Sequence, residues 1–111
     1  MMLEDEGHEV RSGRDGRDGY LISLQFKPDL VITDIQMPGE NGIVLMENIR
    51  KHNPRVRTIY MSGDLNRFGF SLEEEKKREQ VRLLEKPFSM VELLRLLYFF
   101  SSQRGKDERE N

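Results

Sequence analysis

The stretch Asp-Leu-Val-Ile-Thr-Asp-Ile-Gln-Met-Pro-Gly-Glu-Asn-Gly, residues 29–42, decides the fold. Leu30, Val31 and Ile32 follow one another without a polar residue between them, and two of the three are β-branched. A short unbroken apolar run of this kind predicts a strand that is buried on both faces, as in a parallel sheet. The run leads to Asp34, so the sequence predicts a carboxylate at the end of a buried strand, facing a loop.

Helical and strand patterns alternate outward from this strand. Upstream, the sequence predicts a strand over 8–12 and a helix over 20–26. Downstream, the predicted elements are a helix over 42–52, a strand over 57–61, a charged helix opened by a capping box at 71–74, a strand over 81–84 and a helix opened by a second capping box at 89–92. This alternation predicts βαβ units in an open, doubly wound α/β sheet. Residues 1–102 are expected to form one domain, and residues 103–111 a polar, disordered tail.

Three polar residues fall at the carboxyl ends of successive predicted strands, namely Asp34, Ser62 and Lys86. Ligands of open α/β sheets bind just beyond those ends, so these side chains are expected to converge. Taken singly, each has a simpler interpretation: an aspartate that starts a loop, a serine that caps a turn, and an exposed lysine. Their joint position at one edge of the sheet favours a functional site.

The sequence around these residues resembles that of response-regulator receiver domains. The loop from Asp34 to Gly42 matches the family pattern of Asp, two residues, Met-Pro, three residues and Gly at every fixed position. Met61-Ser62-Gly63 resembles the family's hydroxyl residue with a small residue after it, and residues 85–88 (Glu-Lys-Pro-Phe) resemble its Lys-Pro-Phe signature. The resemblance covers about residues 3 to 100 and implies a flavodoxin-like fold with strand order 2-1-3-4-5.

The resemblance also implies roles for the matching residues. Asp34 would be the phosphoacceptor, Lys86 would pair with the phosphate, and Ser62 would donate a hydrogen bond to it. The carboxylate of Asp34 and the backbone carbonyl of Gln36 would bind Mg²⁺, which prefers oxygen ligands. The Lys86–Pro87 peptide bond would be cis, as in the family. The protein would assist its own phosphorylation without being an enzyme.

Two positions depart from the family. The residue three positions before Lys86 is usually aromatic, and its rotation reports phosphorylation, but here it is Leu83. The resemblance further aligns Leu3 to Val10 with the end of the first helix and the start of the second strand. The first strand and its Mg²⁺-binding acidic pair therefore have no counterpart, and the chain is interpreted as truncated at its N-terminus. Glu4, Asp5 and Glu6 cannot replace that pair because they align with the wrong end of the sheet, so Mg²⁺ binding is expected to be weakened.

A vacant strand position in the middle of the sheet would be unstable, because each buried unpaired backbone group costs about 1–3 kcal/mol. We therefore expect the second and third strands to pair anew, a strand to be borrowed from a neighbouring molecule, or the chain to be part of a longer protein. Self-association is a further expectation. The last helix has an inner stripe of Met90, Leu93, Leu94, Leu97 and Phe100, and Leu96 and Phe99 are predicted to lie off that face. This surplus of apolar residues over 90–100 predicts a homo-oligomer.

Composition narrows the choice of partners. The 111 residues carry a net charge of −2, which gives no electrostatic reason to expect nucleic acid or a membrane surface as partner. The chain has no cysteine and no apolar run near the length of a membrane span, so a cytoplasmic location is expected. His8 and His52 lie outside the motifs and are interpreted as surface residues. The charged run from Glu73 to Glu79, with Glu73/Lys77 and Glu74/Arg78 pairs, is interpreted as a solvated helix face.

The leading functional hypothesis is a phosphoacceptor in a two-component phosphorelay, which takes its phosphoryl group from a sensor histidine kinase or phosphotransfer protein and switches a partner interaction. The first alternative is a pseudo-receiver, a binding module that is not phosphorylated, which the missing acidic pair favours. The second is a phosphatase of the haloacid dehalogenase type, which also uses a strand-end aspartate. That class needs a second acid two residues later, where this chain has Gln36. The chain has no room for a DNA-binding output domain.

Overall fold

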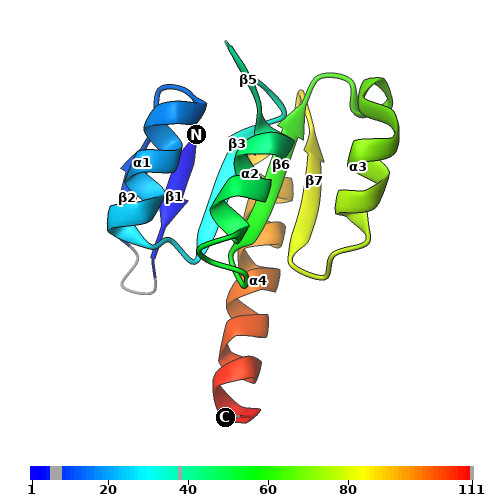
Figure 1. The fold of residues 1–111 in the computed structure, drawn as a ribbon. Coiled ribbons are helices and arrows are strands. Elements are labelled where there is room, and N and C mark those ends of the chain that lie inside the picture. The colour runs from blue at the N-terminus through cyan, green and yellow to red at the C-terminus, as the bar shows by residue number, and fades with distance from the viewer. Residues whose placement is uncertain (6–8, 38, 111) are drawn as a thin grey trace.

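The structure is a computed structural model that describes residues 1–5, 9–37 and 39–110; the side chains of residues 68, 70 and 101–110 are not described. Figure 1 shows the arrangement of its elements. Along the chain these are β1 (Met2–Glu4), β2 (Val10–Ser12), α1 (Gly16–Phe26), β3 (Leu30–Asp34), β4 (Gln36–Met37), β5 (Glu40–Asn41), α2 (Gly42–Arg50), β6 (Arg57–Ser62), the 3₁₀-helix η1 (Leu65–Phe68), α3 (Gly69–Lys76), β7 (Val81–Glu85) and α4 (Met90–Glu110).

The main sheet has the order β2-β1-β3-β6-β7, and β3, β6 and β7 run parallel to one another. Two cores lie on its opposite faces. Val31, Met46 and Leu72 belong to the core beneath α1, α2 and α3, whereas Ile59 and Phe100 belong to the core beneath α4. Figure 1 shows α2 in front of the sheet and α4 behind it. The predicted doubly wound, flavodoxin-like fold with its 2-1-3-4-5 order is therefore confirmed.

The strand position between β2 and β3 is filled by the chain's own first residues. Met2–Glu4 forms β1, which lies between β2 and β3 and is antiparallel to both. Leu3 and Glu4 are thus in a strand, which corrects the expectation that they correspond to the end of a helix. The physical reason is that β1 supplies hydrogen-bond partners to Leu30, Val31 and Ile32 and buries the side chain of Leu3 completely. The expected direct pairing of the second and third strands, β2 and β3, does not occur, because β1 lies between them.

Local signals in the sequence account for the starts of three helices. Asp15 caps α1 by accepting a hydrogen bond from the backbone N–H of Asp18, and Asn41 caps α2 in the same way through Ile43. The predicted cap at Ser89 is confirmed, because its hydroxyl accepts from the backbone N–H of Glu92 at 3.2 Å. The strands predicted over 57–61 and 81–84 are β6 and β7.

Helix α3 differs from the prediction at its start and in its ion pairs. It begins at Gly69 rather than at a Ser71 cap, because η1 ends directly before it and the chain is already helical there. The ion pairs on its surface join residues three apart, Glu73–Lys76 and Glu74–Lys77, rather than the residues four apart that the sequence predicted.

Helix α4 is rotated relative to the predicted inner stripe. Met90 and Leu94 are 66% and 54% exposed, whereas Leu96 and Phe99 pack on the core, so these four assignments were wrong. The guanidinium of Arg82 on β7 lies 4.3 Å from the centre of the Phe99 ring, so Phe99 faces the sheet. The backbone of residues 103–110 continues α4 where a disordered tail was expected. The prediction for His8 lies outside the described residues, and His52 is an exposed residue near the hydroxyl of Tyr20.

Candidate functional site

The candidate site lies at the carboxyl ends of three parallel strands. Asp34 is the last residue of β3, Ser62 is the last residue of β6, and Lys86 follows β7. Strand register brings these ends together, because Asp34 pairs with Met61 and Ser62 with Glu85. Nζ of Lys86 lies 2.5 Å from Oδ1 of Asp34, although 52 residues separate them in the chain. A carboxylate and an ammonium group therefore form an ion pair at this edge of the sheet, and both groups are partly exposed to solvent.

The Asp34 carboxylate is open to an incoming group. Its side chain is 37% exposed and that of Lys86 is 45% exposed, so the ion pair lies at the surface and not in a closed pocket. One carboxylate oxygen contacts Lys86, and no other group among the described residues donates a hydrogen bond to the Asp34 side chain. Such an oxygen can act as a nucleophile toward a reagent that approaches from solvent.

Ser62 is mostly buried and orients its hydroxyl through the following turn. Its Oγ accepts a hydrogen bond from the backbone N–H of Asp64 at 3.0 Å. A hydroxyl has one proton to donate in addition to its acceptor lone pairs. The accepted bond therefore fixes the oxygen and leaves the proton free for an acceptor at the strand ends. The backbone of Ser62 is fixed as well, since its carbonyl accepts from the N–H of Lys86 at 2.7 Å.

The loop after Asp34 is a small hairpin of β4 and β5, in which Gln36 pairs with Asn41. Gly42 closes it, and only glycine fits there, because a Cβ at this position would lie 2.2 Å from the carbonyl oxygen of Asp34. This close backbone approach is a physical reason for the glycine at the end of the motif. Pro38 of the same motif lies outside the described residues. The Lys86–Pro87 peptide bond is cis, as predicted.

The donor set expected for Mg²⁺ does not fit a resident ion. Within the described ranges, no group of three acidic or histidine side chains could hold a metal. The Asp34 carboxylate and the Gln36 carbonyl offer two protein groups and one negative charge, and Lys86 already engages one of the carboxylate oxygens. Mg²⁺ gives up its water reluctantly and is held by carboxylates together with substrate phosphates. The free protein therefore offers too few ligands to hold Mg²⁺ stably.

A buried ionic network links α2, α3 and β6, and the sequence did not reveal it. The Nη2 of Arg50 on α2 donates to both oxygens of Glu75 on α3, at 2.7 and 2.8 Å. The hydroxyl of Tyr60 on β6 donates to the same carboxylate at 2.5 Å, and Nε of Arg78 donates to it at 3.0 Å. The charged run from Glu73 to Glu79 was interpreted as a solvated helix face, but Glu75 within it is buried.

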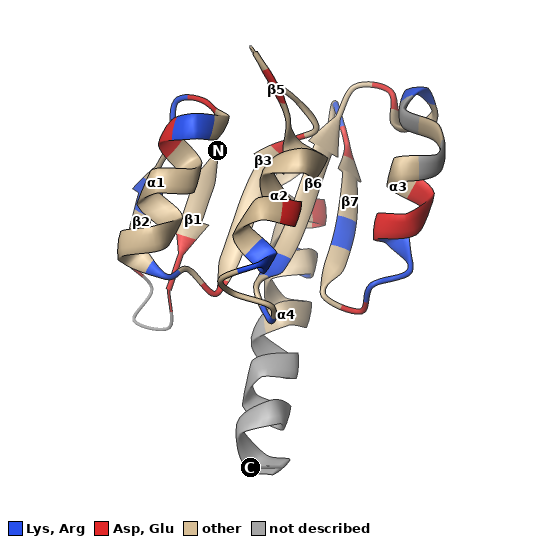
Figure 2. Cartoon of the chain, in the orientation of Figure 1, with Lys and Arg blue, Asp and Glu red and all other residues tan. Residues whose placement is uncertain are grey.

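A second contact at the site was also missed. Nη1 of Arg67, on η1, donates to Oε1 of Gln36 at 3.0 Å and so joins the turn after β6 to the loop after β3. No sequence signal pointed to it, because 31 residues separate the pair. Acidic and basic residues are interspersed over the elements coloured in Figure 2, and neither sign gathers over the face in view.

Comparison with known proteins shows which family the sequence matches and which proteins it resembles. The chain matches the family described as response regulator receiver domain over residues 1–98. It is 44% identical over 50 residues to the protein PilH of Pseudomonas aeruginosa, an alignment that covers 45% of this chain. It is 34% identical over 88 residues to the DNA-binding transcriptional regulator NtrC of Azospirillum brasilense, covering 79% of this chain.

A solved structure agrees. The receiver domain of NtrX from Brucella abortus superposes with a TM-score of 0.70 at 27% identity, covering 84% of this chain and 78% of that one. This chain spans 41% of the length of PilH and 18% of the length of NtrC. Among the described residues, no helix combines the length and the apolar content that crossing a bilayer requires.

Proposed function

This chain belongs to the response regulator receiver domain family, and on that premise we propose that it accepts a phosphoryl group on Asp34 from a histidine kinase or phosphotransfer protein. The observation that carries the proposal is the 2.5 Å contact between Asp34 and Lys86 at an open strand edge. The phosphorylated form then switches an interaction with a downstream partner. We propose a cytoplasmic location for this exchange.

The transfer is a single displacement at phosphorus. An oxygen of the Asp34 carboxylate attacks the phosphorus atom of a phosphohistidine, and the bond between phosphorus and the imidazole nitrogen breaks with its electron pair left on the ring. The product on this chain is an acyl phosphate. The ammonium of Lys86 offsets the charge that gathers on the phosphoryl oxygens, and the free proton of the Ser62 hydroxyl is available to one of them.

Mg²⁺ is the ion that receiver domains generally bind at the phosphorylation site. On this chain we propose weak binding through Asp34 and the Gln36 carbonyl, because two oxygen ligands hold Mg²⁺ poorly. Labelling is therefore expected to be slow and to need a high Mg²⁺ concentration. The same shortage of ligands is what favours the alternative of a pseudo-receiver that binds a partner without being phosphorylated.

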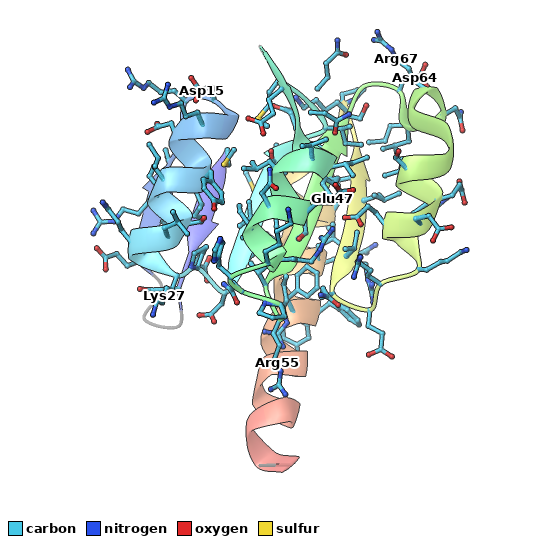
Figure 3. All side chains as sticks on the ribbon, in the orientation of Figure 1. Asp15, Lys27, Glu47, Arg55, Asp64 and Arg67 are labelled. Atoms are coloured by element: carbon cyan, nitrogen blue, oxygen red, sulfur yellow. The ribbon has the colours of Figure 1, made fainter. Side chains whose placement is uncertain are left out.

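Phosphodonor treatment separates these two functions. We expect acetyl phosphate to add one phosphoryl group to the chain, and the Asp34→Asn variant to take up none, because an amide is a poor nucleophile and forms no stable acyl phosphate. Intact-protein and peptide mass spectrometry measure the label. Glu47→Gln, which removes an exposed carboxylate on α2, is the matched control and should label as the parent chain does (Figure 3). An unlabelled parent chain would leave the pseudo-receiver as the function.

We also propose that the chain self-associates through α4. Met90, Val91, Leu94 and Tyr98 are all more than half exposed and lie on one side of this helix. Large apolar side chains gathered in this way favour burial against a partner. The parent chain is expected to sediment as a dimer at micromolar concentration and the Leu94→Asp variant as a monomer. A parent chain that stays monomeric under these conditions would contradict this surface as an interface.

A further inference from the structure

Arg67 is a positively charged residue at the same edge of the molecule as the phosphoacceptor. It belongs to η1, which begins three residues after Ser62. Its Nη1 donates to the side chain of Gln36, which lies two residues after Asp34. One N–H of the guanidinium is used in this bond, whereas a guanidinium has five N–H donors in a planar fork. Figure 3 shows Arg67 beside Asp64, at the end of the molecule where β6 ends.

The turn that carries Arg67 is fixed at several points. The backbone N–H of Asp64 is bonded to Ser62 Oγ, and Oδ1 of Asp64 accepts from the N–H of Asn66 at 3.1 Å. The N–H of Arg67 in turn donates to the Asp64 carbonyl at 3.4 Å. One short segment therefore carries both the Ser62 hydroxyl, at the end of β6, and the Arg67 guanidinium, which contacts Gln36 in the loop that follows Asp34.

The charge at the site calls for a second cation. A phosphoryl group brings about −1.5 to −2 charges at neutral pH. Lys86 contributes one positive charge, and the neighbouring carboxylates of Asp64 and Glu85, both exposed, make the local balance more negative. The two protein ligands available to Mg²⁺ do not retain that ion firmly. A guanidinium suits the task, because its fork pairs with two phosphate oxygens at once and it never loses its proton.

We propose that Arg67 is a catalytic residue that pairs with the phosphoryl group on Asp34 and, together with Lys86, balances its charge. This inference rests on the proposed function and adds a residue to it. Gln36 holds the guanidinium near Asp34 before the donor arrives, and the remaining N–H groups then bond the phosphoryl oxygens. Arg67 exchanges no proton in this role. With acetyl phosphate, the new bond joins an Asp34 oxygen to phosphorus, and acetate leaves with the electron pair of the broken bond.

The test compares Arg67→Ala and Arg67→Lys with a matched control. Arg55→Ala removes an equal charge from an exposed arginine at the opposite end of the molecule (Figure 3). The initial rate of labelling by acetyl phosphate is measured by intact-protein mass spectrometry over a series of NaCl concentrations. We expect Arg67→Ala to label about three- to tenfold more slowly, as loss of one partly exposed charge-assisted pair implies. Arg67→Lys should recover part of the rate, and Arg55→Ala should match the parent chain.

The dependence on salt separates an electrostatic role from a structural one. The parent rate should fall as NaCl rises, and the rate of Arg67→Ala should fall less steeply, because one attractive charge is gone. If Arg67→Ala labels at the parent rate while Asp34→Asn stays unlabelled, the role of Arg67 is wrong and the proposed function stands. If Arg55→Ala lowers the labelling rate as much as Arg67→Ala does, the effect comes from the net charge of the protein alone, and the inference is overturned. If Asp34→Asn labels as the parent chain does, the proposed function falls, and the role of Arg67 falls with it.

Discussion

Replacing Glu75 with alanine is expected to lower the free energy of unfolding by about 3–5 kcal/mol, because it leaves the buried Arg50 guanidinium without its counter-ion. The Arg50 and Glu75 side chains are 8% and 4% exposed, so water cannot take over the lost bonds. The variant also removes the acceptor of the Tyr60 hydroxyl. Nη1 of Arg50 already lacks a hydrogen-bond partner among the described residues, so loss of Glu75 would leave both terminal nitrogens of the guanidinium unpaired. Urea unfolding followed by circular dichroism measures the change.

Glu74→Ala is the matched control for this prediction. Glu74 precedes Glu75 on α3 and forms an exposed pair with Lys77, whose loss should change stability by less than about 0.5 kcal/mol. Equal stabilities of the Glu74 and Glu75 variants would show that the network carries no net stabilisation. Glu75→Gln keeps the shape of the side chain and removes its charge, and it should lie between the two.

The network also makes stability depend on pH at both ends of the range. Burial alone would raise the pKa of Glu75, but hydrogen bonds from Tyr60 and Arg50 outweigh it and lower that pKa from its ordinary 4.5. Its contribution is therefore present above pH 4.5 and lost as the pH falls through the lowered value. Burial, and then the hydrogen bond to Glu75, raise the pKa of Tyr60 above its ordinary 10.0, so stability is lost as the pH rises beyond 10. Tyr60→Phe should lack this alkaline loss.

Truncating Leu3 to alanine is expected to cost about 2–5 kcal/mol, as for other fully buried leucines. Leu3 is the one buried side chain of β1, and its removal loosens the strand that lies between β2 and β3. Met2→Ala is the control, since the Met2 side chain is 47% exposed. Chemical denaturation measures both variants, and hydrogen exchange of the amides of Leu30 to Ile32 reports the pairing of β1 with β3. If Leu3→Ala were no less stable than Met2→Ala, β1 would not be the strand that fills this position.

The sequence predicted the three parallel strands because their signal is local. An unbroken apolar run such as Leu30 to Ile32 fits no solvated element, and a polar residue at each end marks the strand boundary. The convergence of Asp34 and Lys86 then followed from topology alone, since parallel strands share an edge. The serine cap of α4 could be predicted for the same reason, as a cap depends on residues three apart.

The features that escaped prediction depend on contacts between distant segments. The segment from Met2 to Glu4 is too short to show a helical or strand periodicity in its sequence. It forms a strand because its backbone pairs with that of β3. Glu75 stands in a run of charged residues, and its burial depends on Arg50 and Tyr60, which come from other elements. The orientation of α4 depends likewise on contacts with distant strands, among them that of Phe99 with Arg82.

The three-residue strand β1 is a joint between two parts of the sheet, and α1 also packs against α2 across this boundary. On one side lie β2 and α1, and on the other lie β3, β6 and β7 with the remaining helices. The joint pairs with Leu30 to Ile32 and not with Asp34. Asp34, Ser62 and Lys86 all belong to the larger part, which contacts the smaller one where α1 meets α2 and where Gly16 lies against the Glu40 side chain in the hairpin after Asp34. An opening at the joint would therefore also have to separate α1 from this hairpin, so motion of the N-terminal segment is mechanically coupled to the loop that follows Asp34.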